Sequence, residues 1–394
     1  MKIFVLVSRV PWPLEKGDKL RAYHQVREMS KAHEVMLCCL SDQPIHPEAI
    51  AHLCTFCAHV EVVKLQKWRI AVRMILGLFS SRPLQVHYFF QRAAARMVES
   101  HIQRFAPDHI YCQLIRCSEY VKNLHHVPKT LDYMDAFNKG MERLAEQSRF
   151  ILRTLWRMEA RRLVRYENLI FDYFDHHTII SKQDQQLIYH PKRNTIVVIP
   201  NGVDTAFFAP QPADKKYDVV FTGNMSYPPN IDTAELLAHE VMPVVWKTHP
   251  NATLLIAGAS PHPRVSALAK KERVTVSGWL DDIREAYLNG KIFAAPLRIG
   301  TGLQNKLLEA MSMELPCITT ALANNALGAL ANHEIVVEES TEAMGHRIVQ
   351  LLDAPKDADE LAKNGREFVL QHFGWTTAVE KLTNLMKSKS EAML

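Results

Sequence analysis

The stretch Pro296-Leu-Arg-Ile-Gly-Thr-Gly-Leu-Gln-Asn-Lys-Leu-Leu-Glu-Ala-Met-Ser-Met-Glu-Leu-Pro-Cys317 decides the fold. It runs from the end of an apolar strand, through a glycine turn, into a helix predicted over 303–313. Gly300 and Gly302 let the backbone turn tightly and approach a ligand. The helix start presents free N–H groups and the positive end of the helix dipole. The pattern predicts an anion site, best suited to phosphate, within a parallel α/β sheet.

Three charged side chains refine this prediction. Arg298 enters the turn and Lys306 lies one turn into the helix, so two cations could flank a diphosphate. Glu309 stands among apolar residues, where a carboxylate needs hydrogen-bond donors, and a pair of ribose hydroxyls would supply them. The alternative is an ordinary surface pair of Lys306 and Glu309 at i, i+3. The glycine turn and Arg298 favour the anion site.

Short β-type runs alternate with helical patterns along all 394 residues, which predicts parallel sheets with crossover helices. The length favours two domains. The fold class predicted is α/β, with two doubly wound Rossmann-like domains facing across a cleft. The first set of strands is expected at 2–7, 34–40, 59–64, 109–113, 130–133, 177–180 and 195–199. The second set is expected at 218–222, 253–257, 274–276, 292–295, 317–319 and 335–337.

The predicted domains are residues 1–204 and 205–374. The segment 207–216, with two prolines and little apolar content, is the best candidate linker. A helix over 375–394 follows the second domain and is expected to pack back on the first. Ligands of such folds bind at the carboxyl ends of the strands. The turns at Gly17-Asp18-Lys19-Leu-Arg21, Gly223-Asn224 and 298–309 are therefore expected at the cleft.

Charge is unevenly distributed: residues 1–200 carry a net +10 and the rest −5. The segment 62–98 has seven basic residues and no acidic one, interleaved with aromatic and aliphatic residues. This is typical of an interfacial helix, so contact with the inner membrane surface and a solvated face are equally good interpretations. Arginines at 149, 153, 157, 161 and 165 form a second basic row, for which a solvated helix face is the simpler interpretation.

Composition favours a cytoplasmic protein. The seven scattered cysteines indicate reduced thiols rather than a disulfide framework, and Cys54-Thr-Phe-Cys57 lacks a second pair for a metal site. The opening apolar run is too short for a signal peptide. No apolar run reaches the roughly 20 residues of a spanning helix, so membrane contact would be peripheral. The basic half lacks a nucleic-acid recognition module, and no nucleic-acid partner is expected.

The chain resembles the family 4 retaining glycosyltransferases of GT-B fold, and is most similar to the sugar transferases of bacterial surface-polysaccharide clusters. The resemblance covers nearly the whole chain. It rests on Pro11-x-Pro13, Gly17-Asp18-Lys19-x-Arg21, Pro200-Asn-Gly-Val-Asp204 with Phe208-x-Pro210, Thr222-Gly223, Gly300-Thr-Gly302 with Lys306-x-x-Glu309-Ala-Met, and Phe373-Gly-Trp375.

The resemblance implies that a hexose moves, with retention, from a nucleotide diphosphate-sugar to a saccharide or lipid-linked acceptor. The second domain would bind the donor and the first the acceptor. Glu309 matches the glutamate that holds the donor ribose, and Thr301 stands where the family has another glutamate. The residues expected to bind the donor are Gly223, Asn224, Gly278, Trp279, Leu280, Gly300, Thr301, Gly302, Leu303 and Glu309. Within this set, Gly278-Trp279-Leu280 would hold the nucleotide base.

The family often has an Arg and a Lys after the first strand of the second domain, where this chain has Asn224 and Asn230. We expect Arg298 and Lys306 to supply that charge and to stabilise the leaving diphosphate, without a metal ion or other cofactor. Asp132 and Asp135 end a strand near the expected cleft. One of them, Asp135 in our assignment, would orient the acceptor hydroxyl, although a helix cap explains Asp135 equally well. Gly17, Asp18 and Arg21 would contact acceptor or phosphate.

Two other functions fit the same motifs. A nucleotide-sugar 2-epimerase would share the diphosphate site but would have no use for the basic, aromatic first domain. A non-catalytic glycosyltransferase-like subunit is consistent with Thr301 in place of a glutamate.

Overall fold

The computed structural model describes residues 1–14, 17–136, 141, 150–299 and 303–388, which form two compact units. The first unit comprises Met1–Pro200 with Trp375–Leu394, and the second comprises Asn201–Gly374. The boundary thus falls four residues before the predicted one. The segment 207–216 is not a linker, because it lies inside the second unit.

Within the described residues, the first unit has a seven-stranded parallel sheet of order β3-β2-β1-β4-β5-β6-β7. Its strands are β1 (Lys2–Val7), β2 (Glu34–Ser41), β3 (His59–Lys64), β4 (His109–Gln113), β5 (Lys129–Asp132), β6 (His176–Ile179) and β7 (Val197–Val198). Its helices are α1 (Gly17–Met29), α2 (Ala49–Leu53), α3 (Lys67–Leu78), α4 (Leu84–Phe89), α5 (Arg92–Phe105), α7 (Phe150–Phe171), α8 (Lys182–Leu187) and α17 (Trp375–Lys387), with 3-10 turns at Ile115–Tyr120 and Arg193–Thr195.

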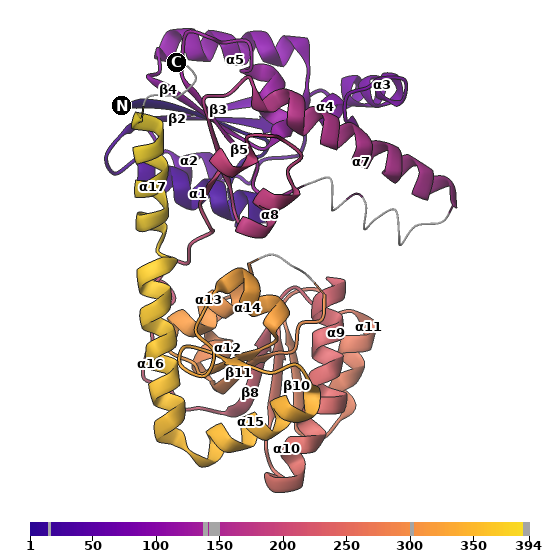
Figure 1. Ribbon diagram of the computed structural model, residues 1–394, viewed down its shortest axis with the longest axis vertical. Coiled ribbons are helices and arrows are strands. Elements are labelled where there is room, and N and C mark those ends of the chain that lie inside the picture. The colour runs from indigo at the N-terminus through magenta and orange to yellow at the C-terminus, as the bar shows by residue number, and fades with distance from the viewer. Residues whose placement is uncertain (15–16, 137–140, 142–149, 300–302, 389–394) are drawn as a thin grey trace. The chain divides into compact units, whose positions relative to one another are not determined.

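Both faces of the first sheet are buried, which is why its strands read as continuous apolar runs. Along β1, Phe4 and Leu6 join the core under α5 and α7, while Ile3 and Val5 join the core under α1 and α17. Figure 1 shows α5 and α1 on opposite sides of this sheet.

The last helix, α17, completes the second of these cores. Leu382 and Met386 are buried there, and the Trp375 ring stacks on His24 with 4.9 Å between centroids. The prediction that this helix packs on the first domain is confirmed.

The described part of the second unit has a six-stranded parallel sheet of order β10-β9-β8-β11-β12-β13. Its strands are β8 (Tyr217–Thr222), β9 (Leu254–Ala257), β10 (Val274–Gly278), β11 (Gly290–Ala295), β12 (Cys317–Thr319) and β13 (Val336–Val337). Its helices are α9 (Pro228–Leu236), continued by a π-helical turn at Leu237–Val241, α10 (Met242–Thr248), α11 (Pro263–Ser266), α12 (Arg284–Leu288), α13 (Asn305–Ser312), α14 (Ala321–Leu327), α15 (Thr341–Asp353) and α16 (Pro355–His372), with a 3-10 turn at Ala267–Lys270.

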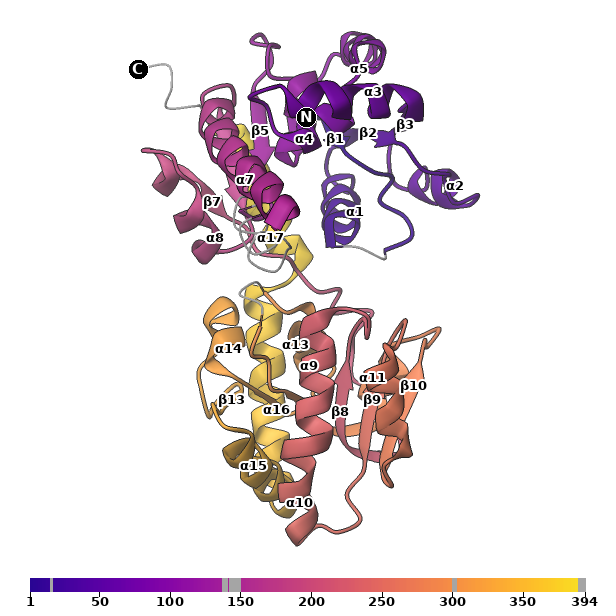
Figure 2. The same ribbon diagram turned by 90° about the vertical axis from the view of Figure 1, so that its right-hand side faces the viewer.

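Helices cover both faces of the second sheet as well, with α9 and α11 on one side and α13 and α16 on the other (Figure 1, Figure 2). The strand order of each sheet reverses beside its first strand, between β1 and β4 in the first unit and between β8 and β11 in the second. Open α/β sheets bind ligands at such switch points, at the carboxyl ends of the strands. The predicted fold class is confirmed for each unit.

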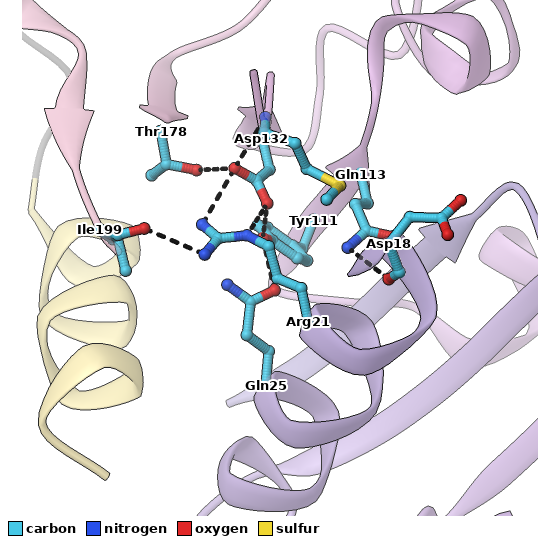
Figure 3. A network of polar contacts seen from close by, with 9 residues as sticks. Asp18, Arg21, Gln25, Tyr111, Gln113, Asp132, Thr178 and Ile199 are labelled. Atoms are coloured by element: carbon cyan, nitrogen blue, oxygen red, sulfur yellow. Dashed lines mark hydrogen bonds and ion pairs between the residues drawn. The ribbon is translucent and has the colours of Figure 1, made fainter. Parts of the chain in front are cut away.

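A fully buried ion pair ties α1 to the first sheet. The Arg21 guanidinium donates to both carboxylate oxygens of Asp132, at 2.7 and 3.2 Å, and to the carbonyl oxygen of Ile199 at 3.0 Å. Asp132 also accepts hydrogen bonds from the hydroxyls of Tyr111 and Thr178, at 2.7 and 2.9 Å (Figure 3). Helix α1, the three strands β4, β5 and β6, and the chain just after β7 therefore meet in a single polar cluster.

Candidate functional site

Two strand-end glycines bring the backbone of the second unit close together at its switch point. Gly223 follows β8 with φ of +155°, and Gly258 follows β9 with φ of +143°. A Cβ on Gly258 would lie 1.7 Å from the carbonyl oxygen of Gly223, so only glycine fits there. Asn224, which follows Gly223 in this turn, is exposed.

Lys306 projects into this turn from α13. Its ammonium donates to the amide oxygen of Asn230 and lies 4.9 Å from the centroid of the Phe221 ring. Asn230 in turn donates to the carbonyl oxygen of Asn224 at 2.8 Å. Burial lowers the pKa of Lys306 to about 8, against the opposing effect of the Glu309 carboxylate. The site therefore holds a half-buried cation beside the carboxyl end of β8.

Glu309 lies one turn further along α13 and is held by buried hydroxyls. The Tyr287 hydroxyl donates to one carboxylate oxygen at 2.6 Å and shares a hydrogen bond of 2.7 Å with the Thr222 hydroxyl. Burial raises the pKa of Glu309, although Tyr287 and Lys306 oppose that shift. Tyr287 engages one of the two oxygens, so the carboxylate remains suited to accept hydrogen bonds from a diol.

The helix start completes the arrangement. α13 begins at Asn305, two residues later than predicted, and the side chain of its N-cap residue Gln304 makes no capping hydrogen bond to the helix backbone. Leu303, just before it, is half-buried against the core of the second unit. The first turn thus presents backbone N–H groups at the same sheet edge as Lys306. A helix terminus with an adjacent cation is suited to an anion.

The structure gives Arg298 a different partner from Lys306. Its exposed guanidinium pairs with Glu240 at 3.3 Å. A charge-stabilising role for Arg298 therefore stays a prediction. Of the two predicted cations, Lys306 is the one that the described contacts hold beside Gly223.

The predicted base-binding segment lies at the end of β10. Gly278 has φ of +70° and accepts a hydrogen bond of 3.0 Å from the Gly258 N–H. Trp279 is exposed, and its indole N–H donates to Asp281, while Leu280 packs on the core. The segment thus shares the carboxyl edge of the sheet with Gly223. The predicted Gly300, Thr301 and Gly302 lie outside the described residues.

In the first unit, the prediction that Arg21 contacts acceptor or phosphate is wrong. The guanidinium is 0% exposed, and its donors are used by Asp132 and Ile199. A buried guanidinium needs a carboxylate partner, and the fold supplies one from β5. Gly17, at the start of α1, is exposed.

Asp18 belongs instead to a charged cluster at the switch point of the first sheet. Its carboxylate pairs with Arg9 at 2.6 Å and with Arg116 at 2.9 Å. Asp135 interacts electrostatically with Arg116 and keeps contact with solvent. The atoms packed around its carboxyl nevertheless raise its pKa to about 6, with a further contribution from Asp184. Three predicted positions, Gly17, Asp18 and Asp135, thus lie at the carboxyl edge of this sheet.

A groove of about 770 Å³ adjoins this cluster. Arg9, Arg116 and Asp42 contribute polar groups to it, and the remaining wall is largely apolar. The groove is lined by Arg9, Asp42, Gln43, Met74, Ile75, Leu78, Leu84, Gln85, Tyr88, Phe89, Arg116, Met141, Leu155, Trp156 and Glu159. This combination suits a molecule with an anionic or hydroxylated part and an apolar part.

Sequence reasoning missed four residues of these sites. Gly258 carries the same signal as Gly223, a glycine directly after a strand, and could have been found by it. Tyr287, Arg9 and Arg116 carry no local signal, because only the packing of α12, β1 and β4 places them.

The described residues contain no group of three or more His, Cys, Asp or Glu side chains placed to hold a metal ion. None of the helices they form is long and apolar enough to cross a membrane.

Another hollow, of about 700 Å³, lies at the amino ends of β8 and β11, around the ion pair of Asp218 and Lys291. It faces the opposite sheet edge from the candidate site.

Comparison with known proteins agrees with this geometry. Residues 216–354 match the family "Glycosyl transferases group 1". The chain is 23% identical to a 44.6 kDa protein in the cps region of Klebsiella pneumoniae, over 94% of this chain and 96% of that protein. It is 28% identical to a GDP-mannose-dependent monoacylated α-(1-6)-phosphatidylinositol monomannoside mannosyltransferase of Corynebacterium glutamicum, over 51% of this chain and 57% of that protein.

Solved structures show the fold of the whole chain. HepE from Anabaena, in complex with UDP-glucose, superimposes with a TM-score of 0.66 at 14% identity, over 99% of this chain and 100% of that one. Both units thus have the Rossmann-like architecture of GT-B glycosyltransferases. The residues that match the group 1 glycosyl transferases lie in the second unit and include Lys306 and Glu309.

Proposed function

We propose that this chain is a retaining hexosyltransferase of family 4, which moves a sugar from a nucleotide diphosphate-sugar to a saccharide or lipid-linked acceptor. The observation that carries the proposal is the cluster of Lys306, Glu309 and the α13 start beside Gly223. A cation and the start of a helix suit a diphosphate. A carboxylate with an oxygen to spare suits a ribose diol.

The proposed chemistry requires charge stabilisation at the leaving group. Breaking the glycosidic bond builds negative charge on the nucleoside diphosphate, which Lys306 and the α13 dipole would meet. This scheme asks for no metal ion. The group 1 glycosyl transferase match supports sugar transfer, and the UDP-glucose bound to HepE and the GDP-mannose dependence of the Corynebacterium enzyme support a nucleotide-sugar donor.

We assign the acceptor to the groove of the first unit. Arg9 and Arg116 stand at its polar end, and Asp135 is the titratable carboxyl beside them. A carboxyl with a raised pKa is suited to hydrogen-bond an acceptor hydroxyl. We place the reaction in the synthesis of cell-surface polysaccharide, as the resemblance to such transferases implies.

Binding of a panel of UDP, GDP, ADP and their sugars, followed by calorimetry, tests the donor site. We expect selective binding of one nucleotide by the wild type, and binding weakened about 10-fold or more in Glu309→Ala, because a hydrogen bond to a charged group contributes about 1.5–3 kcal/mol. Glu272→Ala, which removes an exposed carboxylate of the same unit, should bind like wild type. Failure of every nucleotide to bind would favour a non-catalytic subunit.

Donor affinity should also fall above about pH 8. Only protonated Lys306 attracts the diphosphate, and its pKa of about 8 means that the free protein loses this charge as the pH rises further. The terminal phosphate, with a second pKa of about 6, is already ionised at pH 7, so the diphosphate keeps its charge in this range. Affinity measured from pH 7 to 9.5 should fall toward 10-fold per unit in wild type and stay flat in Lys306→Gln. An equal slope in both proteins would contradict the assignment.

A further inference from the structure

α3 exposes a row of large apolar side chains along one face. Trp68 is 64% exposed, Ile75 and Leu76 are each 62% exposed, and Phe79, directly after the helix, is 89% exposed. With Val72 they stand at i, i+4, i+7, i+8 and i+11, the spacing of a single helix face. Isolated exposed apolar residues are ordinary, but a continuous row of five marks an interaction surface.

α7 exposes a row of positive charge. Arg153, Arg157, Arg161 and Arg165 recur every four residues, and all four are exposed. A surface hollow of about 470 Å³ is lined by Ser81, Thr154, Arg157, Met158, Arg161, Arg162 and Arg165. The residues that line this hollow include four arginines and no acidic residue. Arginines grouped in this way suit phosphate oxygens.

The two rows belong to one surface because Arg162 joins the helices that carry them. Its guanidinium donates to the carbonyl oxygens of Gly77 and Leu78, the last residues of α3, at 3.0 and 2.8 Å. One turn earlier on α7, Glu159 accepts a hydrogen bond of 2.6 Å from the Leu84 N–H at the start of α4. Figure 1 shows α3, α4 and α7 adjoining one another. The apolar row thus ends beside the arginine-lined hollow.

We propose that this α3–α7 surface, defined by the apolar row and the arginine row, docks on an anionic lipid bilayer. The apolar row would enter the boundary between headgroups and acyl chains, and the arginines would meet lipid phosphates. Charge complementarity selects this occupant, because α3 contains no acidic residue and adds Lys67, Arg69 and Arg73 beside its apolar face, and the hollow on α7 is lined by arginines without an acidic residue.

The surface adjoins the groove assigned to the acceptor. Ile75 and Leu78 of α3 line that groove, and Ile75 also belongs to the apolar row. An acceptor anchored in the bilayer would therefore meet an apolar wall that leads toward Arg9 and Arg116. This last step, which names a lipid-linked acceptor, rests on the proposed function. The proposal that this surface docks on a bilayer does not rest on the proposed function.

Flotation with vesicles of pure phosphatidylcholine, and with vesicles containing 30 mol% phosphatidylglycerol, tests the proposal on the full chain. We expect selective binding to the anionic vesicles that weakens from 0.1 to 0.5 M salt. Arg157→Gln/Arg161→Gln/Arg165→Gln should weaken binding about 100-fold, since each charge near an anionic surface contributes about fivefold. Trp68→Ser/Val72→Ser/Leu76→Ser should also weaken binding to the anionic vesicles, because it removes apolar side chains that would enter the bilayer.

The matched control is Arg27→Gln/Lys31→Gln/Arg104→Gln, which removes the same charge from exposed positions of the first unit outside α3, α4 and α7 and should bind nearly as wild type does. An equal loss in this control would show a general charge effect and overturn the surface assignment. No binding of wild type to anionic vesicles would overturn it as well. A dimer that is seen by light scattering and that dissociates in the α3 variant would also overturn the assignment. Nucleotide binding by the same samples separates these outcomes from failure of the proposed function.

Discussion

Lys306→Ala should lower the turnover of the donor sugar by about 10²–10³-fold, the usual cost of removing one group that stabilises charge in a transition state. The ammonium of Lys306 lies at the carboxyl end of β8, where it donates a hydrogen bond to Asn230 and contacts the Phe221 ring. In the substituted protein, only the α13 N–H groups would remain to stabilise the charge of the leaving diphosphate. Steady-state hydrolysis or transfer of the donor, with the nucleotide product quantified, measures the effect.

Controls distinguish this role from a loss of folding. Lys291→Ala removes a partly exposed lysine that pairs with Asp218 at the opposite sheet edge, and it should leave turnover unchanged. Lys306→Ala should keep the wild-type circular dichroism spectrum, because the smaller side chain introduces no steric clash. If Lys306→Ala turned over donor at the wild-type rate, the assignment of this lysine would fail.

Asp132→Ala should destabilise the first unit by about 3–5 kcal/mol, since it leaves the Arg21 guanidinium buried without its carboxylate. A typical domain has only about 5–15 kcal/mol of stability. The variant is therefore expected to unfold at much lower denaturant, with a large fraction unfolded at 37 °C. Denaturant unfolding followed by intrinsic fluorescence measures the shift.

Two further variants test the physical reason. Arg21→Met/Asp132→Leu removes both charges and should recover part of the loss, because a well-packed apolar pair can replace a buried ion pair. Lys31→Ala breaks the exposed pair with Glu28 and should cost less than about 1 kcal/mol. If Asp132→Ala proved as mild as Lys31→Ala, the buried pair would not hold α1 to the sheet.

The strands could be predicted closely from the sequence. β1, β3, β4 and β12 have the predicted bounds, and the remaining strands differ by one to two residues at one or both ends. Strands covered by helices on both faces must be apolar almost throughout. The burial that stabilises each sheet therefore leaves its mark in local composition, which needs no knowledge of the partner strands.

The predicted linker shows where composition misleads. Residues 207–216 contain prolines and charges, yet Phe207 lies 3.9 Å beneath the Arg284 guanidinium and Phe208 packs on the core of the second unit. The Phe208 carbonyl oxygen also accepts a hydrogen bond from Ser312. These partners are more than 70 residues away in the sequence, so nothing within the segment indicates them.

The same reason separates the correct from the wrong predictions about charged residues. Lys306 and Glu309 were assigned to one site because they share a helix, whose start follows a strand end by the chain's own order. Arg21 was assigned to a ligand because its loop contains Gly17 and Asp18, but its partner Asp132 lies 111 residues further on. By itself, the sequence determined the alternation of strands and helices, the two sheets and the helix that carries Lys306 and Glu309. Only the tertiary structure decided which charges are paired and which stay at the surface, because a charge's partner depends on which distant elements the crossover connections bring together.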